Sequence, residues 1–207
     1  NMLQQEYKID EYGKEILLQD DEHQVMMEWE KPYMEACIDK LQPKGDVLEI
    51  GFGMGYSATQ IQKYKPKSHT IIEMDPMVIE KAKIWAHDYD NITIVQGTWQ
   101  KMISKLGMFD EIFFDDYPLK VPENELEKKL TSERIHMFLD IIKYNHSKSI
   151  TKVSAYIHDP NNTFIERINA RQDCTYQEYR FNIDIPDNCN YYRDSKAIIP
   201  IITFGQR

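Results

Sequence analysis

The sequence has few of the residues that mark several protein classes. Only eight glycines occur in 207 residues, about half of the usual share of roughly 7%. No apolar run approaches the roughly 18 residues that a membrane-spanning helix needs, which excludes a transmembrane protein. The three cysteines, Cys37, Cys174 and Cys189, lie far apart and form no Cys-x-x-Cys pair. We therefore expect reduced thiols, no metal site and a cytoplasmic protein.

Basic residues are also in deficit. The chain has 25 Lys and Arg against 34 Asp and Glu, which gives a formal net charge of −9. Binding to a phosphate backbone normally needs a basic surface, so we expect neither nucleic acid nor a membrane as a partner. The length is sufficient for one domain with a substantial core, and we expect residues 1–207 to form a single domain.

The apolar pattern predicts an α/β fold with a mostly parallel sheet and helices on both faces. Strands are predicted at 46–50, 69–73, 92–95, 110–115, 151–157, 176–183 and 196–204. Helices are predicted at 56–65, 77–87, 123–144 and 161–170. The last two strands predict an antiparallel hairpin at the edge of the sheet. Val25, Met26, Trp29 and Tyr33 recur at helical spacing, so we expect residues 1–45 to form a helical cover.

Three of the eight glycines, Gly51, Gly53 and Gly55, follow the first predicted strand of this sheet. Glycine permits tight turns and close approach of the backbone to a ligand, and ligands of such folds bind at the carboxyl edge of the sheet. Glu73 ends the next strand, where a carboxylate can accept both hydroxyls of a ribose. Tyr56 stands where a dinucleotide fingerprint needs a small residue. These residues predict a nucleoside site without a phosphate cradle, which suits S-adenosylmethionine.

Other residues at the same edge suit the rest of a ligand. Trp99 and Gln100 follow the third strand, where an aromatic ring and an amide can meet an adenine ring. Asp115 follows the fourth strand, and Glu30 lies in the predicted N-terminal helix. Two converging carboxylates match the paired donors of a guanidinium. They would also suit a metal ion or a polyamine.

Six segments resemble, in order, the successive motifs of the guanidinoacetate N-methyltransferase family: 25–34, 47–54, 71–73, 97–99, 115–119 and 191–192. The resemblance implies a Rossmann-like class I methyltransferase fold whose N-terminal segment folds over the active site. It also implies that Glu30 and Asp115 hold the substrate guanidinium. Cofactor contacts are implied for Tyr12, Met26, Met34, Phe52, Gly53, Met54, Gly55, Tyr56, Ser57, Glu73, Met74, Asp75, Trp99 and Gln100.

The expected chemistry requires a base. A guanidinium has no free lone pair and a pKa above about 12, so it must lose a proton as its nitrogen attacks the sulfonium methyl group. Asp115 is the predicted base, and Glu30 would orient the planar group and stabilise its charge.

One segment departs from the family pattern. The family has Leu-Thr after the fifth strand, and the backbone N–H groups of this pair are implied to hold the substrate carboxylate. This sequence has Asp159-Pro160 there. Proline has no N–H to donate, and an aspartate repels a carboxylate at close range. His158 or Asp159 can instead receive an α-ammonium, while a helix N-cap is the other role open to Asp159.

The sequence therefore predicts S-adenosylmethionine-dependent methylation of a small guanidino compound. The candidates are guanidinoacetate, or arginine or a related guanidino amino acid, with the enzyme a monomer or a homodimer. Two alternatives remain at this point: another transferase on the same fold, such as an aminopropyltransferase, and a non-catalytic S-adenosylmethionine-binding protein.

Overall fold

The computed structural model describes residues 4–117, 124–158 and 162–205. In this part of the chain, seven strands form one sheet in the order β6-β5-β4-β7-β8-β10-β9. Strands β4 to β8 run parallel, whereas β10 is antiparallel to both of its neighbours. The mostly parallel sheet and its antiparallel C-terminal hairpin are thus confirmed. The strands are β4 (Asp46–Ile50), β5 (Ser68–Glu73), β6 (Ile92–Gln96), β7 (Phe109–Phe114), β8 (Ser147–Ala155), β9 (Thr175–Asn182) and β10 (Lys196–Phe204).

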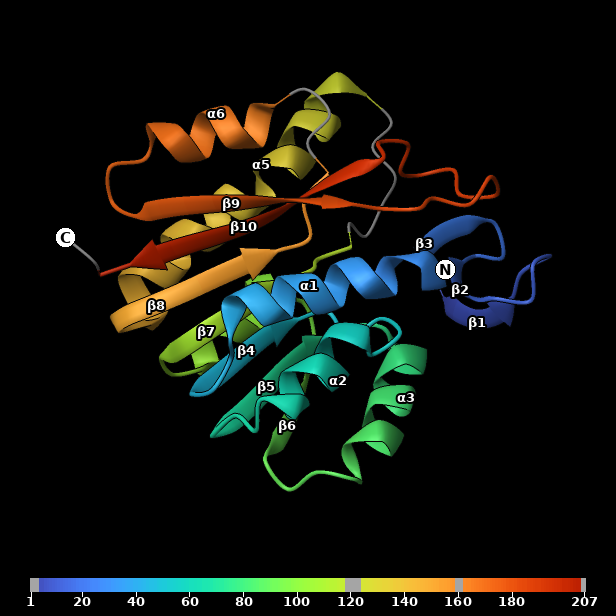
Figure 1. Cartoon of the computed structure of the whole chain (residues 1–207). Helices are drawn as coiled ribbons and strands as arrows, with labels where there is room; N and C mark the ends of the chain where they lie inside the picture. The colour runs from blue at the N-terminus through green and yellow to red at the C-terminus, as the bar shows by residue number, and fades with distance from the viewer. Residues whose placement is uncertain (1–3, 118–123, 159–161, 206–207) are drawn as a thin grey trace.

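Helices cover both faces of the sheet (Figure 1). One face packs against α1 (Lys31–Leu41), α2 (Tyr56–Lys63) and α3 (Pro76–Ala86). The other face packs against α4 (Trp99–Met102), α5 (Glu125–Ile141) and α6 (Thr163–Ala170). Three short turns complete the helical elements: the 3-10 turns η1 (Glu28–Glu30) and η2 (Ile103–Lys105) and the π-helical turn η3 (Ile142–His146).

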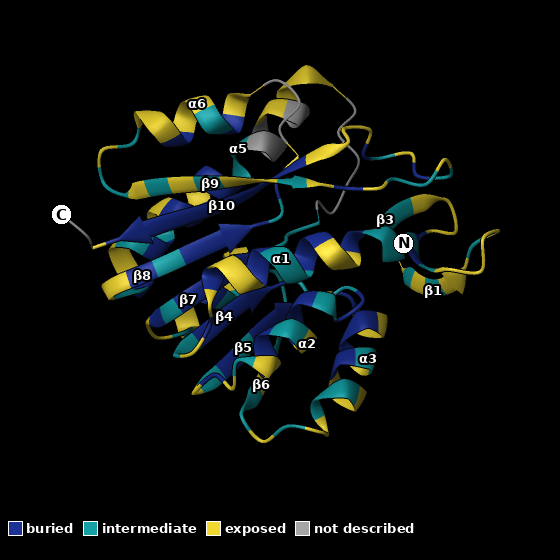
Figure 2. Ribbon diagram, viewed as in Figure 1, coloured by how far each residue is buried: buried dark blue, intermediate teal, exposed yellow. Residues whose placement is uncertain are grey.

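The strands are apolar on both faces because helices cover both. Val47 of β4 and Phe113 of β7 are buried on the α1 side, whereas Leu48 and Ile112 are buried on the α5 side. Figure 2 shows the buried central strands between the partly exposed helices. Two apolar layers therefore pack the sheet against its helices, which leaves the carboxyl ends of the parallel strands for ligand contacts.

The N-terminal segment differs from the prediction. Residues 5–27 form a three-stranded antiparallel sheet of β1 (Gln5–Ile9), β2 (Glu15–Gln19) and β3 (His23–Met27). The expected helical cover is therefore wrong for these residues, and the helical elements of this segment, η1 and α1, begin only at Glu28. Reverse turns explain the difference, because Gly13, Asp20 and Asp21 all adopt positive φ angles. Such residues favour hairpins over a continuous helix.

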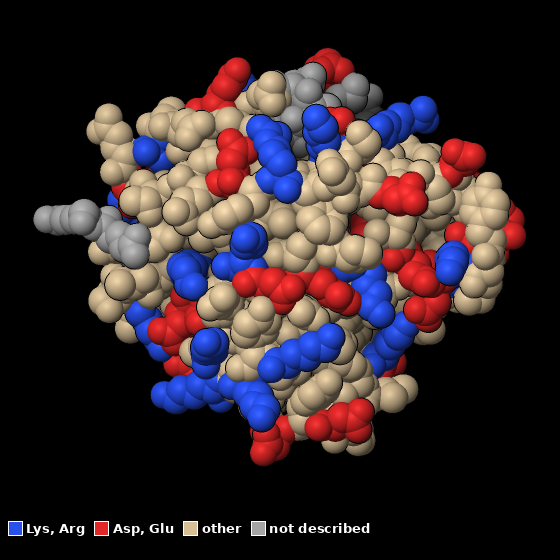
Figure 3. All heavy atoms as spheres, viewed as in Figure 1, with Lys and Arg blue, Asp and Glu red and all other residues tan. Residues whose placement is uncertain are grey.

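The surface carries both signs of charge. On the face shown in Figure 3, Lys and Arg side chains lie among Asp and Glu side chains. All three cysteines are free, and no described helix has the length and apolar character needed to cross a membrane. The cytoplasmic location and the absence of nucleic-acid partners stay predictions.

Candidate active site

The glycine loop between β4 and α2 has a backbone that only glycine accommodates easily. Gly51, Gly53 and Gly55 all have positive φ angles, of 83°, 56° and 79°. A Cβ atom at Gly51 would lie 2.2 Å from the Asp115 carbonyl oxygen, and one at Gly53 would lie 2.8 Å from the Met26 sulfur. The loop therefore passes close both to the end of β7 and to the N-terminal sheet.

Replacing Gly51 with alanine is expected to lower the free energy of unfolding by about 1–3 kcal/mol, because alanine disfavours this φ angle and its methyl group meets backbone. Urea unfolding would measure the change. Gly107→Ala is the matched control, since a Cβ atom there meets nothing within 4 Å. Equal stability of the two variants would contradict the close packing at Gly51.

Glu73 lies at the tip of β5, beside the glycine loop. Its Oε1 accepts a hydrogen bond from the Phe52 N–H at 3.0 Å, and its Oε2 accepts from Met74 N–H at 2.7 Å and Asp75 N–H at 3.1 Å. Burial raises the pKa of this carboxyl, and the backbone donors oppose the rise. The carboxylate is thus fixed at the sheet edge where the sequence predicts a ribose contact.

The N-terminal sheet covers the glycine loop. The Tyr7 hydroxyl donates a hydrogen bond to the Gly53 carbonyl, and the Gln5 N–H donates to Asp75 Oδ2 at 3.1 Å. Asp75 also caps α3, because its Oδ1 accepts from the N–H groups of Met77 and Val78. The cover is thus made of strands, and Asp75 serves it structurally; a cofactor contact from Asp75 stays a prediction.

Trp99 lies deeper than the sequence predicts for a base platform. Its side chain is 3% exposed and packs edge-on against Phe114 and Phe138 at centroid distances of 5.9 and 5.3 Å. Its Nε1 donates to Asp116 Oδ2 at 3.0 Å, and Arg134 Nε donates to the same oxygen at 2.8 Å. The ring therefore has a clear core role, and its contact with adenine stays a prediction.

The remaining predicted cofactor residues fall into two groups. Tyr12, Met74 and Gln100 are exposed, with 56% exposure for Tyr12 at the tip of its hairpin. The others lie in or against the apolar core around the glycine loop: Met26, Met34, Phe52, Met54, Tyr56 and Ser57.

Two carboxylates lie together beyond the glycine loop. Asp115 directly follows β7, and its N–H donates to the Ile50 carbonyl at 3.0 Å. Glu30 ends η1 and is 3% exposed. Burial raises the pKa of Glu30 well above its usual range, and the charge of Asp115 adds to the rise. Neither carboxylate forms an ion pair with a Lys or Arg in the described ranges.

Asp115 also has a perturbed pKa. Burial raises the pKa of this carboxyl to about 7, and the nearby charges of Glu49, Asp116 and Glu73 contribute, whereas Arg134 opposes the rise. A carboxyl that titrates near neutral pH can accept a proton under working conditions.

Two tyrosine hydroxyls near Glu30 lack a hydrogen bond of normal geometry in the described part of the chain. The hydroxyls of Tyr156 and Tyr191 approach its carboxylate, but neither completes a hydrogen bond of normal geometry. The buried Trp29 Nε1 is likewise without a partner among the described residues. Tyr156 immediately follows β8, so its place on a neighbouring strand end is a signal that the sequence analysis missed. Tyr191 belonged to a resembling motif but had no assigned role.

A buried polar chain lies behind Asp115. Glu49 on β4 accepts a hydrogen bond from the Ser57 hydroxyl and lies 3.0 Å from His69 Nε2, while Gln62 contacts the other ring nitrogen at 2.9 Å. Glu49 and His69 are fully buried. These hydrogen bonds link the start of α2, through Ser57, to β4 and β5.

The predicted substrate residues beyond β8 are only partly visible. His158 stacks on Tyr192 with ring centroids 4.1 Å apart. Asp159 and Pro160 lie outside the described residues, so the role expected for Asp159 stays a prediction. Among the described residues, no group of three His, Cys, Asp or Glu side chains is placed to hold a metal ion.

Comparison with known proteins identifies relatives. A family model described as guanidinoacetate N-methyltransferase matches residues 6–204. Protein arginine N-methyltransferase 2 of Saccharomyces cerevisiae is 29% identical over 223 residues, which cover 97% of this chain and 51% of that protein. The protein of the same name in Candida glabrata is 38% identical over 107 residues, covering 48% of this chain and 26% of that protein. The chain thus spans about half or less of the length of these curated relatives.

Solved structures share the fold. A spermidine synthase in complex with the transition-state analogue AdoDATO has a TM-score of 0.70 and 18% identity, covering 100% of this chain and 70% of that one. A precorrin-6y C5,15-methyltransferase from Geobacter metallireducens has a TM-score of 0.57 and 13% identity, covering 83% and 86%. The arrangement is that of a Rossmann-like class I methyltransferase. Together with the family match over nearly the whole sequence, it leads to one conclusion: the chain belongs to the guanidinoacetate N-methyltransferase family.

Proposed function

We propose that this chain methylates a guanidino nitrogen of a small molecule. Family membership implies S-adenosylmethionine as the cofactor, and its sulfonium supplies an electrophilic methyl group. The carboxylate pair of Glu30 and Asp115 carries the proposal. Two buried like charges are unfavourable without a compensating cation. Among the described residues no Lys or Arg forms an ion pair with either carboxylate, and Arg134, which pairs with Asp116, offsets only part of the rise in the Asp115 pKa. A guanidinium compensates both carboxylates and matches their geometry with paired N–H donors.

The residues around Glu30 suit the orientation of such a group. Glu30 would accept hydrogen bonds from one edge of the guanidinium, with the unpartnered hydroxyls of Tyr156 and Tyr191 close by. Asp115 would accept the proton that the guanidinium loses, because its pKa of about 7 suits general base catalysis. Alignment of the acceptor nitrogen with the methyl group then supplies much of the remaining rate.

The cofactor would lie along the glycine loop. The three glycines give this loop the tight turn by which such loops bring their backbone to a ligand, and Glu73 lies beside the loop at the tip of β5, where we expect it to meet the ribose. These two features fit a nucleoside without phosphates. We carry over the full predicted set as the proposed cofactor site: Tyr12, Met26, Met34, Phe52, Gly53, Met54, Gly55, Tyr56, Ser57, Glu73, Met74, Asp75, Trp99 and Gln100.

A screen of guanidinoacetate, arginine and agmatine with labelled S-adenosylmethionine tests the proposed function. We expect one of these guanidines to gain the mass of a methyl group. A gain of an aminopropyl group would instead indicate the second kind of transferase. Cofactor binding without a labelled product from any guanidine would indicate a non-catalytic binding protein.

The activity should depend on pH through Asp115. Because this carboxyl must be ionised to attract the guanidinium and to accept its proton, kcat/KM should fall about tenfold per pH unit below about 7. The bound guanidinium lowers the pKa of Asp115, so kcat should keep its value to lower pH than kcat/KM. A pH profile of both constants measures this. An acid limb of kcat/KM at the ordinary carboxyl value of 3.8 would contradict the role of Asp115.

A further inference from the structure

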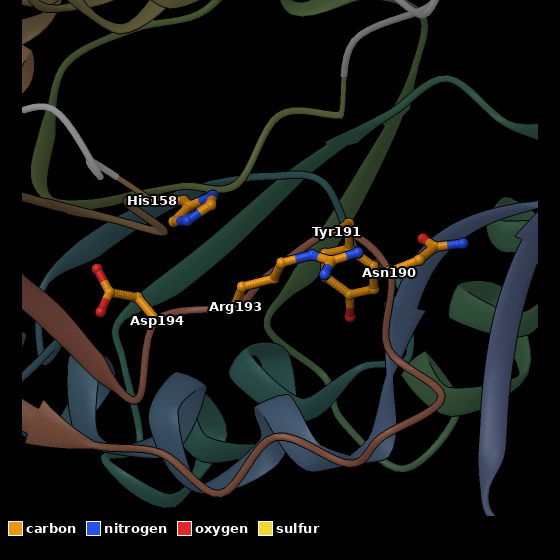
Figure 4. Close-up of a pocket in the computed structure, with 5 residues that line it drawn as sticks. All are labelled: His158, Asn190, Tyr191, Arg193 and Asp194. Atoms are coloured by element: carbon orange, nitrogen blue, oxygen red, sulfur yellow. The ribbon is translucent and has the colours of Figure 1, made fainter.

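An open depression adjoins the carboxylate pair. It has a volume of about 380 Å³ and is lined by His158, Asn190, Tyr191, Arg193 and Asp194 (Figure 4). Four of these residues belong to the loop 183–195 between β9 and β10, and His158 follows β8. Tyr191 lines the depression and also lies beside Glu30, because its hydroxyl approaches the Glu30 carboxylate. A ligand held between Glu30 and Asp115 can therefore extend past Tyr191 into the depression.

The depression carries one exposed charge of each sign. Arg193 and Asp194 are exposed, and neither forms a hydrogen bond or ion pair with another residue that the structure describes. In Figure 4 the Arg193 side chain extends toward Tyr191, and the Asp194 carboxylate points the other way. A neutral or singly charged ligand would leave at least one of these side chains unused.

Hydrogen bonds anchor the loop that forms most of the depression. The Asn190 N–H donates to Gln24 Oε1 at 2.8 Å, and Gln24 Nε2 donates to the Asn188 carbonyl at 2.7 Å. At the other end of the loop, the Ile183 N–H donates to the Ser195 carbonyl at 2.9 Å. Both ends of the segment that presents Arg193 and Asp194 are thus anchored, so less conformational entropy is lost when a ligand binds.

We propose that this depression binds the head group of a free guanidino amino acid, with Arg193 holding the α-carboxylate and Asp194 the α-ammonium. The inference rests on the proposed function and makes arginine, or a close analogue of it, the acceptor. An amino acid carries both charges on one carbon. The Arg193 and Asp194 side chains point in different directions (Figure 4), and both are exposed, so each has to rotate toward the other when the head group binds. Guanidinoacetate has only the carboxylate, and an arginine residue within a peptide has neither charge.

This proposal changes the expected origin of specificity. The sequence offers His158 or Asp159 as the partner of an α-ammonium, with a helix N-cap as the other role open to Asp159. His158 lines the same depression, but it stacks on Tyr192, and Asp159 lies outside the described residues. Asp194 provides the negative charge from the opposite loop.

Binding measurements can test the head-group site without methyl transfer. Titration calorimetry with S-adenosylhomocysteine present would compare arginine with three ligands: agmatine, which lacks the carboxylate, deaminated arginine, which lacks the ammonium, and Nα-acetylarginine amide, which lacks both charges. We expect arginine to bind about 10- to 100-fold more tightly than either singly charged ligand. The doubly neutral ligand should bind most weakly.

Two variants assign the charges. Arg193→Gln should weaken the binding of arginine about 10- to 100-fold. It should weaken the binding of agmatine far less, because agmatine has no carboxylate for Arg193 to hold. Asp194→Asn should weaken the binding of arginine and of agmatine by a similar factor, and the binding of deaminated arginine far less. Arg180→Gln on β9 and Asp184→Asn after it change the same charges outside the depression, and should leave the ranking of ligands unchanged.

Several results would overturn the inference. If Nα-acetylarginine amide bound as tightly as arginine, the protein would not recognise the charged head group of the amino acid. An Arg193→Gln variant that loses arginine and agmatine equally would show a structural effect instead of carboxylate binding. In both cases methylation of any guanidine would leave the proposed function standing. If no guanidine is bound or methylated, the proposed function fails, and the head-group site fails with it.

Discussion

Asp115→Asn is expected to lower kcat by about 10²- to 10⁴-fold. Asparagine keeps the size and one oxygen of the side chain but cannot accept the proton that leaves the guanidinium. Binding of S-adenosylmethionine should stay largely intact, because Asp115 reaches the glycine loop through its backbone carbonyl, and that carbonyl is unchanged. Single-turnover assays and calorimetry of cofactor binding would separate the two effects.

The neighbouring carboxylate offers a matched control. Asp116→Asn removes the same charge one residue away. Trp99 and Arg134 both donate to Asp116 Oδ2, and the amide oxygen of asparagine can take its place as the acceptor. We expect a much smaller loss of kcat in this variant. If Asp115→Asn kept most of the wild-type kcat, another group would be the base and the assignment would fail.

Glu30→Gln is expected to weaken substrate binding and to raise the stability of the free protein. The Kd of the guanidino substrate should rise about 10- to 100-fold, because a charge-assisted pair of hydrogen bonds is lost. The free protein should become more stable by about 0.5–2 kcal/mol, since a buried carboxylate next to Asp115 is removed. Calorimetry would measure the first effect and urea unfolding the second.

The stability effect should also depend on pH. The folded-state pKa of Glu30 lies above its usual value of 4.5, so the folded protein binds the proton more tightly than the unfolded chain does. The free energy of unfolding must then fall as pH rises above 4.5. The gain from Glu30→Gln should therefore be larger at pH 8 than at pH 5. Glu28→Gln, in the same turn but with a 39% exposed side chain, should show neither effect.

The core of the fold could be predicted because burial on two faces leaves a strong sequence signal. The bounds of β4 and β10 agree with the prediction, since most residues of both strands are apolar. β8 begins at Ser147, four residues before the predicted start, because the polar residues 147–149 pair with β7 only at one point. The N-terminal sheet was missed because the residues at helical spacing extend across β3, η1 and α1, whereas the turns at Gly13 and Asp20 went unrecognised.

Some residues of the candidate site could also be predicted from the sequence, and others could not. Asp115 and Glu73 could be located because each ends a parallel strand, and such ends converge at one edge. Glu30 could be named as a candidate carboxylate of the expected N-terminal helix, but only the family resemblance implied that it holds the guanidinium together with Asp115, since nothing local in its 3-10 turn indicates that the side chain is buried. Arg193 and Asp194 could not be found from the sequence. Their place depends on how a loop returns to the sheet, which long-range contacts such as Gln24 with Asn188 decide.

The small N-terminal sheet touches both loops that the proposed reaction needs. Through Tyr7 it holds the glycine loop, and through Gln24 it holds the loop that carries Tyr191. If binding of one ligand orders this sheet, less conformational entropy is lost when the second ligand binds. Thermodynamic linkage makes such an effect reciprocal. Residues 5–27 therefore join the proposed cofactor site to the proposed acceptor site, and we expect any coupling between the two ligands to pass through them.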